Sequence, residues 1–318
     1  MKRTKIWVLA VLALAACSPA PTPSPSGATL APSVSPATST SPASPVASAQ
    51  GGATESPTGT PAPAATASAA KVGHLLARIE YSGGFDTEGF VLTRLPSVSV
   101  YADGTVITQG TAWLSSDPRP LVAPESVQHL APAGLARVRA RIAAARLSSA
   151  AYPAAAPGDA PDTVLRLDGG RVVVRLGSAN PAASFPPAEA AARRPADDLV
   201  AALADIPALA GPGGVSAPEP YVPSALLLYL VMPGAVGWSQ SAVGTGSALA
   251  WTLPVSPSAF GRPISPGWRC GAVAGAGVPA LWQAVSGATE LDYVADGQTE
   301  WTPFVRPLLP DEAAVCGS

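Results

Sequence analysis

Three stretches of the chain alternate between apolar and polar residues on both sides of an Asp-Gly pair. The pairs are Asp103-Gly104, Asp168-Gly169 and Asp296-Gly297. Alternation with a period of two is typical of a strand with one buried face, and Asp-Gly tolerates the positive φ of a tight turn. The pattern therefore predicts three β-hairpins. Pro303 and Pro307 should place the last strand at a sheet edge or end it, because proline donates no ladder hydrogen bond.

Three other stretches have apolar residues at helical spacing and begin with a proline. They are residues 132–147, 195–206 and 279–285. Proline suits the first helical position, whose N–H has no partner within the helix, and Pro207 should stop the second helix. This order predicts an α+β fold of antiparallel hairpins packed with about three helices. The Gly- and Pro-rich stretch 210–220 suggests an N-terminal α+β subdomain (71–212) and a C-terminal one (213–318), although one joint domain stays open.

The N-terminus has the three parts of an export signal. Basic residues within the first five positions precede a short apolar run at 6–13, which suits a signal peptide over residues 1–16. Leu14-Ala15-Ala16-Cys17 resembles the lipobox of bacterial lipoproteins. The resemblance implies that Cys17 carries a lipid and anchors the chain to the outer side of the cell membrane. An ordinary signal peptide with an A-x-A-like cleavage site is the alternative.

The tether that follows this signal, residues 17–70, has the composition of a disordered chain. From residue 18 to residue 70 it contains 11 prolines, no aromatic residue and one charge, Glu55. Such a segment cannot bury enough apolar surface to offset its ordering entropy. We expect it to space the folded part away from a membrane surface.

The composition and the cysteine count limit which classes of partner and which cysteine chemistry we expect. The 318 residues carry a net charge of −2 and only 13% charged residues, which argues against a nucleic-acid partner, since that needs a basic face. Once Cys17 is lipidated, Cys270 and Cys316 remain, and two such cysteines in an exported chain usually pair. We therefore predict a structural disulfide between them, and membrane attachment through Cys17.

Two motifs resemble a catalytic site and a cofactor site, but the rest of the sequence does not fit either site. Residues 237–241 echo the nucleophile elbow G-x-S-x-G, but His74 and His129 both precede the serine, whereas in that fold the histidine follows it. Residues 275–280 match G-x-G-x-x-A, but a dinucleotide site needs a doubly wound sheet. No catalytic residue and no cofactor is assigned.

Metal and aromatic sites have simpler explanations. Asp292, Asp296 and Glu300 recur every four residues, which allows a calcium site, but solvated hairpin charges explain them more simply. No metal ligand is therefore assigned. Five of the six tryptophans beyond residue 71 lie between residues 238 and 301. They indicate either a core or a face that binds a glycan or a peptide.

Residues 80–85, 95–104 and 306–316 resemble a group of secreted proteins from GC-rich bacteria that has no assigned activity. The resemblance therefore implies export but transfers no functional residue. The leading hypothesis is a lipid-anchored extracytoplasmic binding or structural module with a glycan or protein ligand, more readily than an enzyme. The alternatives are a cell-envelope hydrolase whose catalytic carboxylates are not identified and a protease-inhibitor-like module.

Overall fold

The computed structural model describes six stretches of the chain: residues 73–84, 88–110, 116–152, 160–177, 185–235 and 246–316. They belong to a compact unit that runs from Ala64 to Ser318. The predicted signal peptide, Cys17, the tether and residues 237–241 lie outside the described residues. The fold is α+β, as the sequence predicts, with two sheets and, within the described stretches, five α-helices.

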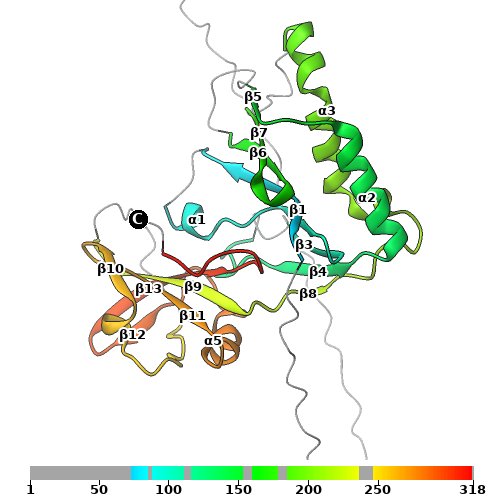
Figure 1. Ribbon diagram of the computed structural model, residues 1–318. Coiled ribbons are helices and arrows are strands. Elements are labelled where there is room, and N and C mark those ends of the chain that lie inside the picture. The colour runs from blue at the N-terminus through cyan, green and yellow to red at the C-terminus, as the bar shows by residue number, and fades with distance from the viewer. Residues whose placement is uncertain are drawn as a thin grey trace, which may run out of the picture. The chain divides into compact units, whose positions relative to one another are not determined.

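The larger sheet has eight strands in the order β5-β7-β6-β1-β2-β3-β4-β8 (Figure 1). All neighbours are antiparallel except β5 and β7. The strands are β1 (Leu75–Ser82), β2 (Val98–Tyr101), β3 (Thr105–Gln109), β4 (Glu125–His129), β5 (Ala150–Tyr152), β6 (Asp162–Leu167), β7 (Val172–Leu176) and β8 (Glu219–Pro220).

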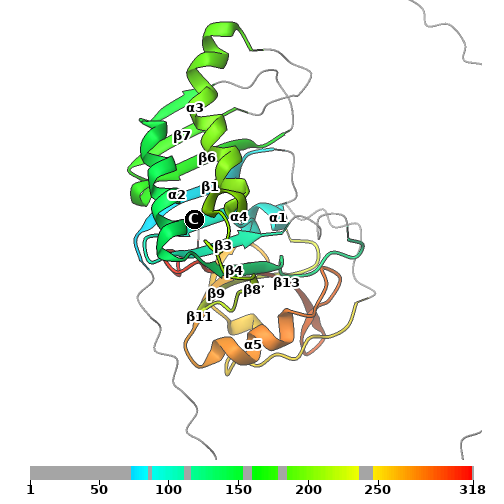
Figure 2. The same ribbon diagram turned by 90° about the vertical axis from the view of Figure 1, so that its right-hand side faces the viewer.

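Three helices cover one face of this sheet (Figure 2). They are α2 (Pro132–Ala145), α3 (Pro187–Ala204) and α4 (Ile206–Ala210). Alternate strand residues such as Ala77 and Val100 face these helices and are fully buried with Val138 of α2 and Leu199 of α3. The alternation seen in the sequence thus builds the larger of the apolar cores.

The second sheet has five strands in the order β10-β11-β9-β13-β12. They are β9 (Ala225–Val231), β10 (Arg262–Ser265), β11 (Trp268–Ala274), β12 (Val294–Asp296) and β13 (Thr299–Pro307), with a 3₁₀ turn η3 (Pro257–Ala259). Helix α5 (Gly277–Val285) buries Leu281 against Leu226 and Leu228 of β9. The short helix α1 (Glu88–Thr93) packs on β13.

All three predicted hairpins are confirmed. The Asp-Gly pairs join β2 to β3, β6 to β7 through the 3₁₀ turn η2 (Asp168–Gly170), and β12 to β13. Gly104, Gly169 and Gly297 have φ of 92°, 64° and 63°, which a residue with a side chain rarely adopts. The helices expected at 132–147 and 279–285 are also present, as α2 and α5.

The prediction that a helix begins at Pro195 and stops at Pro207 is wrong. Helix α3 begins at Pro187 and holds Pro195 in its interior, and Pro207 lies in the first turn of α4. An interior proline costs about 3 kcal/mol through a lost hydrogen bond and a clash. Burial of the α3 face that includes Leu199 and Leu203, both fully shielded, outweighs that local penalty.

The position of the last strand agrees only in part with the prediction made from its prolines. β13 lies between β9 and β12 rather than at the sheet edge. However, β12 pairs only with residues 299–301, whereas β9 pairs with residues 302–307. Pro303 and Pro307 therefore lie beyond the end of β12, and the strand ends at Pro307, as predicted.

The predicted disulfide between Cys270 and Cys316 is confirmed, with a Cα–Cα distance of 5.9 Å. Cys270 lies in β11 and is buried, and Cys316 follows the last strand. The bond fastens the C-terminal segment (residues 308–316) to the five-stranded sheet.

Reduction of this disulfide should lower the free energy of unfolding by about 4 kcal/mol, because the bond closes a loop over a sequence separation of 46 residues. Urea unfolding with and without reductant measures the change. A double variant, Cys270→Ser with Cys316→Ser, should show no further response to reductant. Two free thiols in the denatured, unreduced protein would contradict the pairing.

Candidate functional site

Charged side chains lie on the face of the large sheet opposite helices α2 to α4. In β1, Ala77 and Ile79 pack toward those helices. Arg78 and Glu80 alternate with them and so point to the opposite face. Ser99 of the neighbouring strand lies on the same face and contacts Arg78. The periodicity that builds the core therefore also gathers charge on the other side of the sheet.

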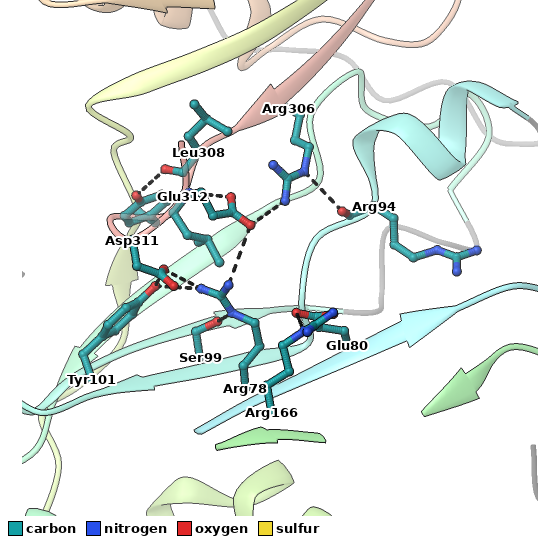
Figure 3. A network of polar contacts seen from close by, with 12 residues as sticks. Arg78, Glu80, Arg94, Ser99, Tyr101, Arg166, Arg306, Leu308, Asp311 and Glu312 are labelled. Carbon is teal, nitrogen blue, oxygen red and sulfur yellow. Dashed lines mark hydrogen bonds and ion pairs between the residues drawn. The ribbon is translucent and has the colours of Figure 1, made fainter. Parts of the chain in front are cut away.

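Arg78 is the centre of a buried polar network (Figure 3). Its Nε donates to Ser99 Oγ at 3.0 Å. Its Nη2 donates to the Tyr101 hydroxyl at 3.1 Å and to Asp311 Oδ1 at 2.6 Å. Its Nη1 lies 3.8 Å from Glu312 Oε1. Tyr101 also donates to Asp311 Oδ1, at 2.7 Å, so one carboxylate oxygen joins both donors.

The protonation states of this network are fixed by burial and by Asp311. Burial lowers the pKa of Arg78, but the charge of Asp311, its hydrogen bond to Arg78 and the charge of Glu312 outweigh that effect, so the net shift is upward. Burial raises the pKa of Tyr101, and its hydrogen bond to Asp311 raises it further. The guanidinium therefore stays charged and the phenol keeps its proton. Removing one partner of such a buried ion pair typically costs about 3–5 kcal/mol, because the other charge is left uncompensated.

The C-terminal segment (residues 308–316) holds these carboxylates in place. Tyr221 donates its hydroxyl hydrogen to the Leu308 carbonyl oxygen at 2.8 Å. Glu312 Oε1 accepts from Arg306 Nη2 at 2.6 Å, and its Oε2 accepts from a backbone N–H within the segment at 3.0 Å. The segment therefore binds both the large sheet and β13.

A cavity of about 380 Å³ opens beside this network. The end of β1, the residues at and after the end of α1, and the C-terminal part of the chain from β13 onward line it. Small-molecule sites typically measure about 300–1,000 Å³. The charged residues of the lining are Glu80, Arg94, Arg306 and Glu312.

Hydrogen bonds hold the charged lining residues in fixed positions (Figure 3). Glu80 Oε1 accepts from Arg166 Nε at 2.8 Å. Arg94 Nη1 donates to the Gly83 carbonyl oxygen at 2.9 Å. Arg306 Nε donates to the Arg94 carbonyl oxygen at 3.4 Å. Burial lowers the pKa of Arg94, so this cationic group of the lining is partly shielded from water.

Apolar side chains complete the cavity. Val91 is unusually exposed for a large apolar residue, at 56%, whereas Leu95 is buried. Both line the cavity. The lining thus combines fixed charges with exposed apolar surface.

A glycine sets how closely α1 approaches β13. Any side chain at Gly89 would collide with the ring of Phe304 on β13. The close approach places Val91 and Arg94 beside Arg306 at the cavity. The cavity wall therefore depends on a helix held against β13.

Glu125 of β4 is a buried carboxyl next to the cavity wall. Both of its oxygens are shielded from solvent and have no hydrogen-bond partner. Burial raises its pKa from an ordinary value of 4.5 to about 8; the nearby charge of Glu312 adds to the shift and Arg306 opposes it. Glu125 is therefore largely protonated at neutral pH.

The sequence analysis assigned none of these residues. The signal that was present is the placement of Arg78 and Glu80 at alternate positions of a strongly apolar strand. Their partners could not be found locally, since Asp311 lies 233 positions from Arg78.

Two of the acidic residues singled out near the last hairpin act as hydrogen-bond acceptors for backbone N–H groups. Asp292 accepts from the backbone N–H groups of Ser247 and Thr289, and Asp296 accepts from that of Ser258. Within the described residues, no group of three or more His, Cys, Asp or Glu side chains is suited to hold a metal ion.

The other sequence candidates lie in structural positions. Residues 275–280 join β11 to α5 beside an antiparallel sheet, which is not the surroundings of a dinucleotide site. His74 pairs with Asp168 at 3.0 Å on the surface, and His129 is exposed. The four tryptophans in the described stretches are buried or partly buried, which favours the core interpretation. They are Trp251, Trp268, Trp282 and Trp301.

In the part of the chain described, no helix combines the length and apolarity needed to cross a membrane. No protein-family model matches the chain, and searches of curated proteins and of solved structures found no match either.

The raised pKa of Glu125 predicts a stability that falls as pH rises. Between about pH 5 and pH 8 the folded chain holds a proton that the unfolded chain has lost. The free energy of unfolding should therefore drop by up to about 1.4 kcal/mol per pH unit and level off above pH 8. Urea unfolding across this range should show a much smaller slope for Glu125→Gln.

Glu219→Gln is the matched control, because Glu219 is exposed on the neighbouring strand β8. Its slope should equal that of the unaltered protein. An unchanged slope in Glu125→Gln would contradict the assignment of a buried proton to Glu125.

Proposed function

We propose that the chain is a lipid-anchored protein of the cell envelope whose folded part binds a small molecule in the cavity beside β1, α1 and β13. Cys17 carries the lipid, as the lipobox-like residues 14–17 indicate. Residues 18–70 then serve as a spacer between the membrane and the binding unit.

The observation that carries the binding role is the cavity with charged walls held by hydrogen bonds. Its four charged lining residues keep their positions through contacts with Arg166, Gly83 and the C-terminal segment. A site organised before binding loses little conformational entropy when a ligand enters.

The hydrolase alternative has less support from the same cavity. Its two carboxylates, Glu80 and Glu312, are each held by an arginine, at 2.8 Å and 2.6 Å, so neither is free to exchange a proton with a substrate. Glu125 does hold a proton, but its oxygens are shielded from solvent. The protease-inhibitor alternative stays a prediction from the sequence.

Replacing Cys17 by Ser should move the protein from the membrane fraction to the soluble fraction, because the lipid is the proposed anchor. Membrane fractionation after labelling with palmitate measures both attachment and lipid. Cys270→Ser is the control, since it removes a cysteine but leaves the anchor. Membrane retention of Cys17→Ser, or no label on the unaltered protein, would contradict the anchor.

Filling the cavity should abolish binding. We expect at least one class among amino acids, sugars and carboxylic acids to raise the melting temperature of the unaltered protein but not of Val91→Trp. Val222→Trp is the matched control, because Val222 is also exposed and does not line the cavity. An equal response in Val91→Trp would place the ligand elsewhere, and no response to any class would count against a binding role.

A further inference from the structure

The charges of the cavity lining balance and lie on different walls. Within its described residues, two carboxylates (Glu80 and Glu312) and two guanidinium groups (Arg94 and Arg306) have a formal sum of zero. Glu80 lies on the β1 side, Arg306 on the opposite side with β13, and Arg94 beside α1 (Figure 3). The cavity therefore presents a dipole rather than a single sign of charge.

A ligand that carries one positive and one negative charge suits such a lining better than an ion of a single sign. A ligand carboxylate matches the planar fork of a guanidinium. A ligand ammonium needs acceptors, and the Glu80 side chain is 25% exposed, with Oε1 engaged by Arg166. The cavity is partly shielded from water. A ligand whose own charges sum to zero therefore does not leave any charged side chain of the protein without compensation.

The apolar part of the lining defines the rest of the ligand. Val91 of α1 lines the cavity, is 56% exposed and precedes Arg94 by three residues. The wall that carries Arg94 thus has exposed apolar surface close by. An uncharged side group of the ligand would cover that surface and gain free energy from burial.

Resting on the proposed binding function, we propose that the cavity binds a small zwitterion that carries an ammonium, a carboxylate and an apolar side group, the chemistry of a free α-amino acid. The carboxylate contacts Arg94, the ammonium contacts Glu80, and the apolar group lies against Val91.

Three probes separate the two charges of the ligand. Isothermal titration of the full chain compares L-phenylalanine with N-acetyl-L-phenylalanine, which lacks the ammonium, and L-phenylalaninamide, which lacks the carboxylate. Each cap should weaken binding at least about tenfold, since it removes a charge-assisted hydrogen bond.

Two variants should respond to different probes. Glu80→Gln should weaken binding of L-phenylalanine and its amide but leave that of the acetyl form unchanged. Arg94→Gln should weaken binding of L-phenylalanine and the acetyl form but leave that of the amide unchanged. Glu219→Gln and Arg171→Gln are the matched controls, because both residues are exposed away from the cavity.

A third variant keeps the test decisive if a charge variant fails to fold. Val91 is exposed, so Val91→Ala should fold, bind L-phenylalanine more weakly and bind glycine unchanged. Equal binding of capped and free probes, or equal loss of L-phenylalanine and glycine binding in Val91→Ala, would overturn the zwitterion assignment. If another class of compound bound in a manner sensitive to Val91→Trp, the binding role would stand without this ligand. Binding of no compound at all would remove both.

Discussion

The structure depends on neutralising one guanidinium in the middle of a sheet. Arg78 lies on a central strand, and Arg166 stands directly opposite it in the register of β1 and β6. Like charges at directly opposed positions destabilise a sheet, and burial makes the cost larger. Glu80 pairs with Arg166, and the compensation for Arg78 comes from Asp311 and Glu312 of the C-terminal segment.

This requirement explains why the C-terminal segment lies where it does, and why a cavity forms beside it. Leu309 buries itself with Tyr101 on the same face of the large sheet, while Cys316 bonds to the five-stranded sheet. The segment is thus attached to both sheets. Glu312 belongs at once to the neutralising network and to the cavity wall. The geometry of the cavity therefore follows from contacts that the fold needs for stability.

The sequence predicted what depends on neighbouring residues and, through its cysteine count, one distant pairing, the disulfide. It did not predict the distant charge pairs. Each Asp-Gly turn is a local backbone preference, and it appeared where expected. The helix start predicted at Pro195 was wrong because burial of Leu199 outweighs the local free-energy cost of an interior proline. Among the site residues, Arg78 and Glu80 could be noticed in the sequence, because they place charges at alternate positions of an apolar strand. Nothing near Asp311 could indicate which cation it neutralises, since that pairing exists only after the sheets have formed.

The distance of 233 positions between Arg78 and Asp311 also bears on when the protein can fold. A ribosome makes the chain from its N-terminus, so β1 and β2 exist long before the carboxylate that Arg78 requires. Until then, closing the charged face would bury an uncompensated cation. The charged face of the large sheet can therefore close only when the C-terminal segment is present to neutralise Arg78. Contacts of such long range slow folding, because the entropy of closing a long loop must be overcome before the contact forms.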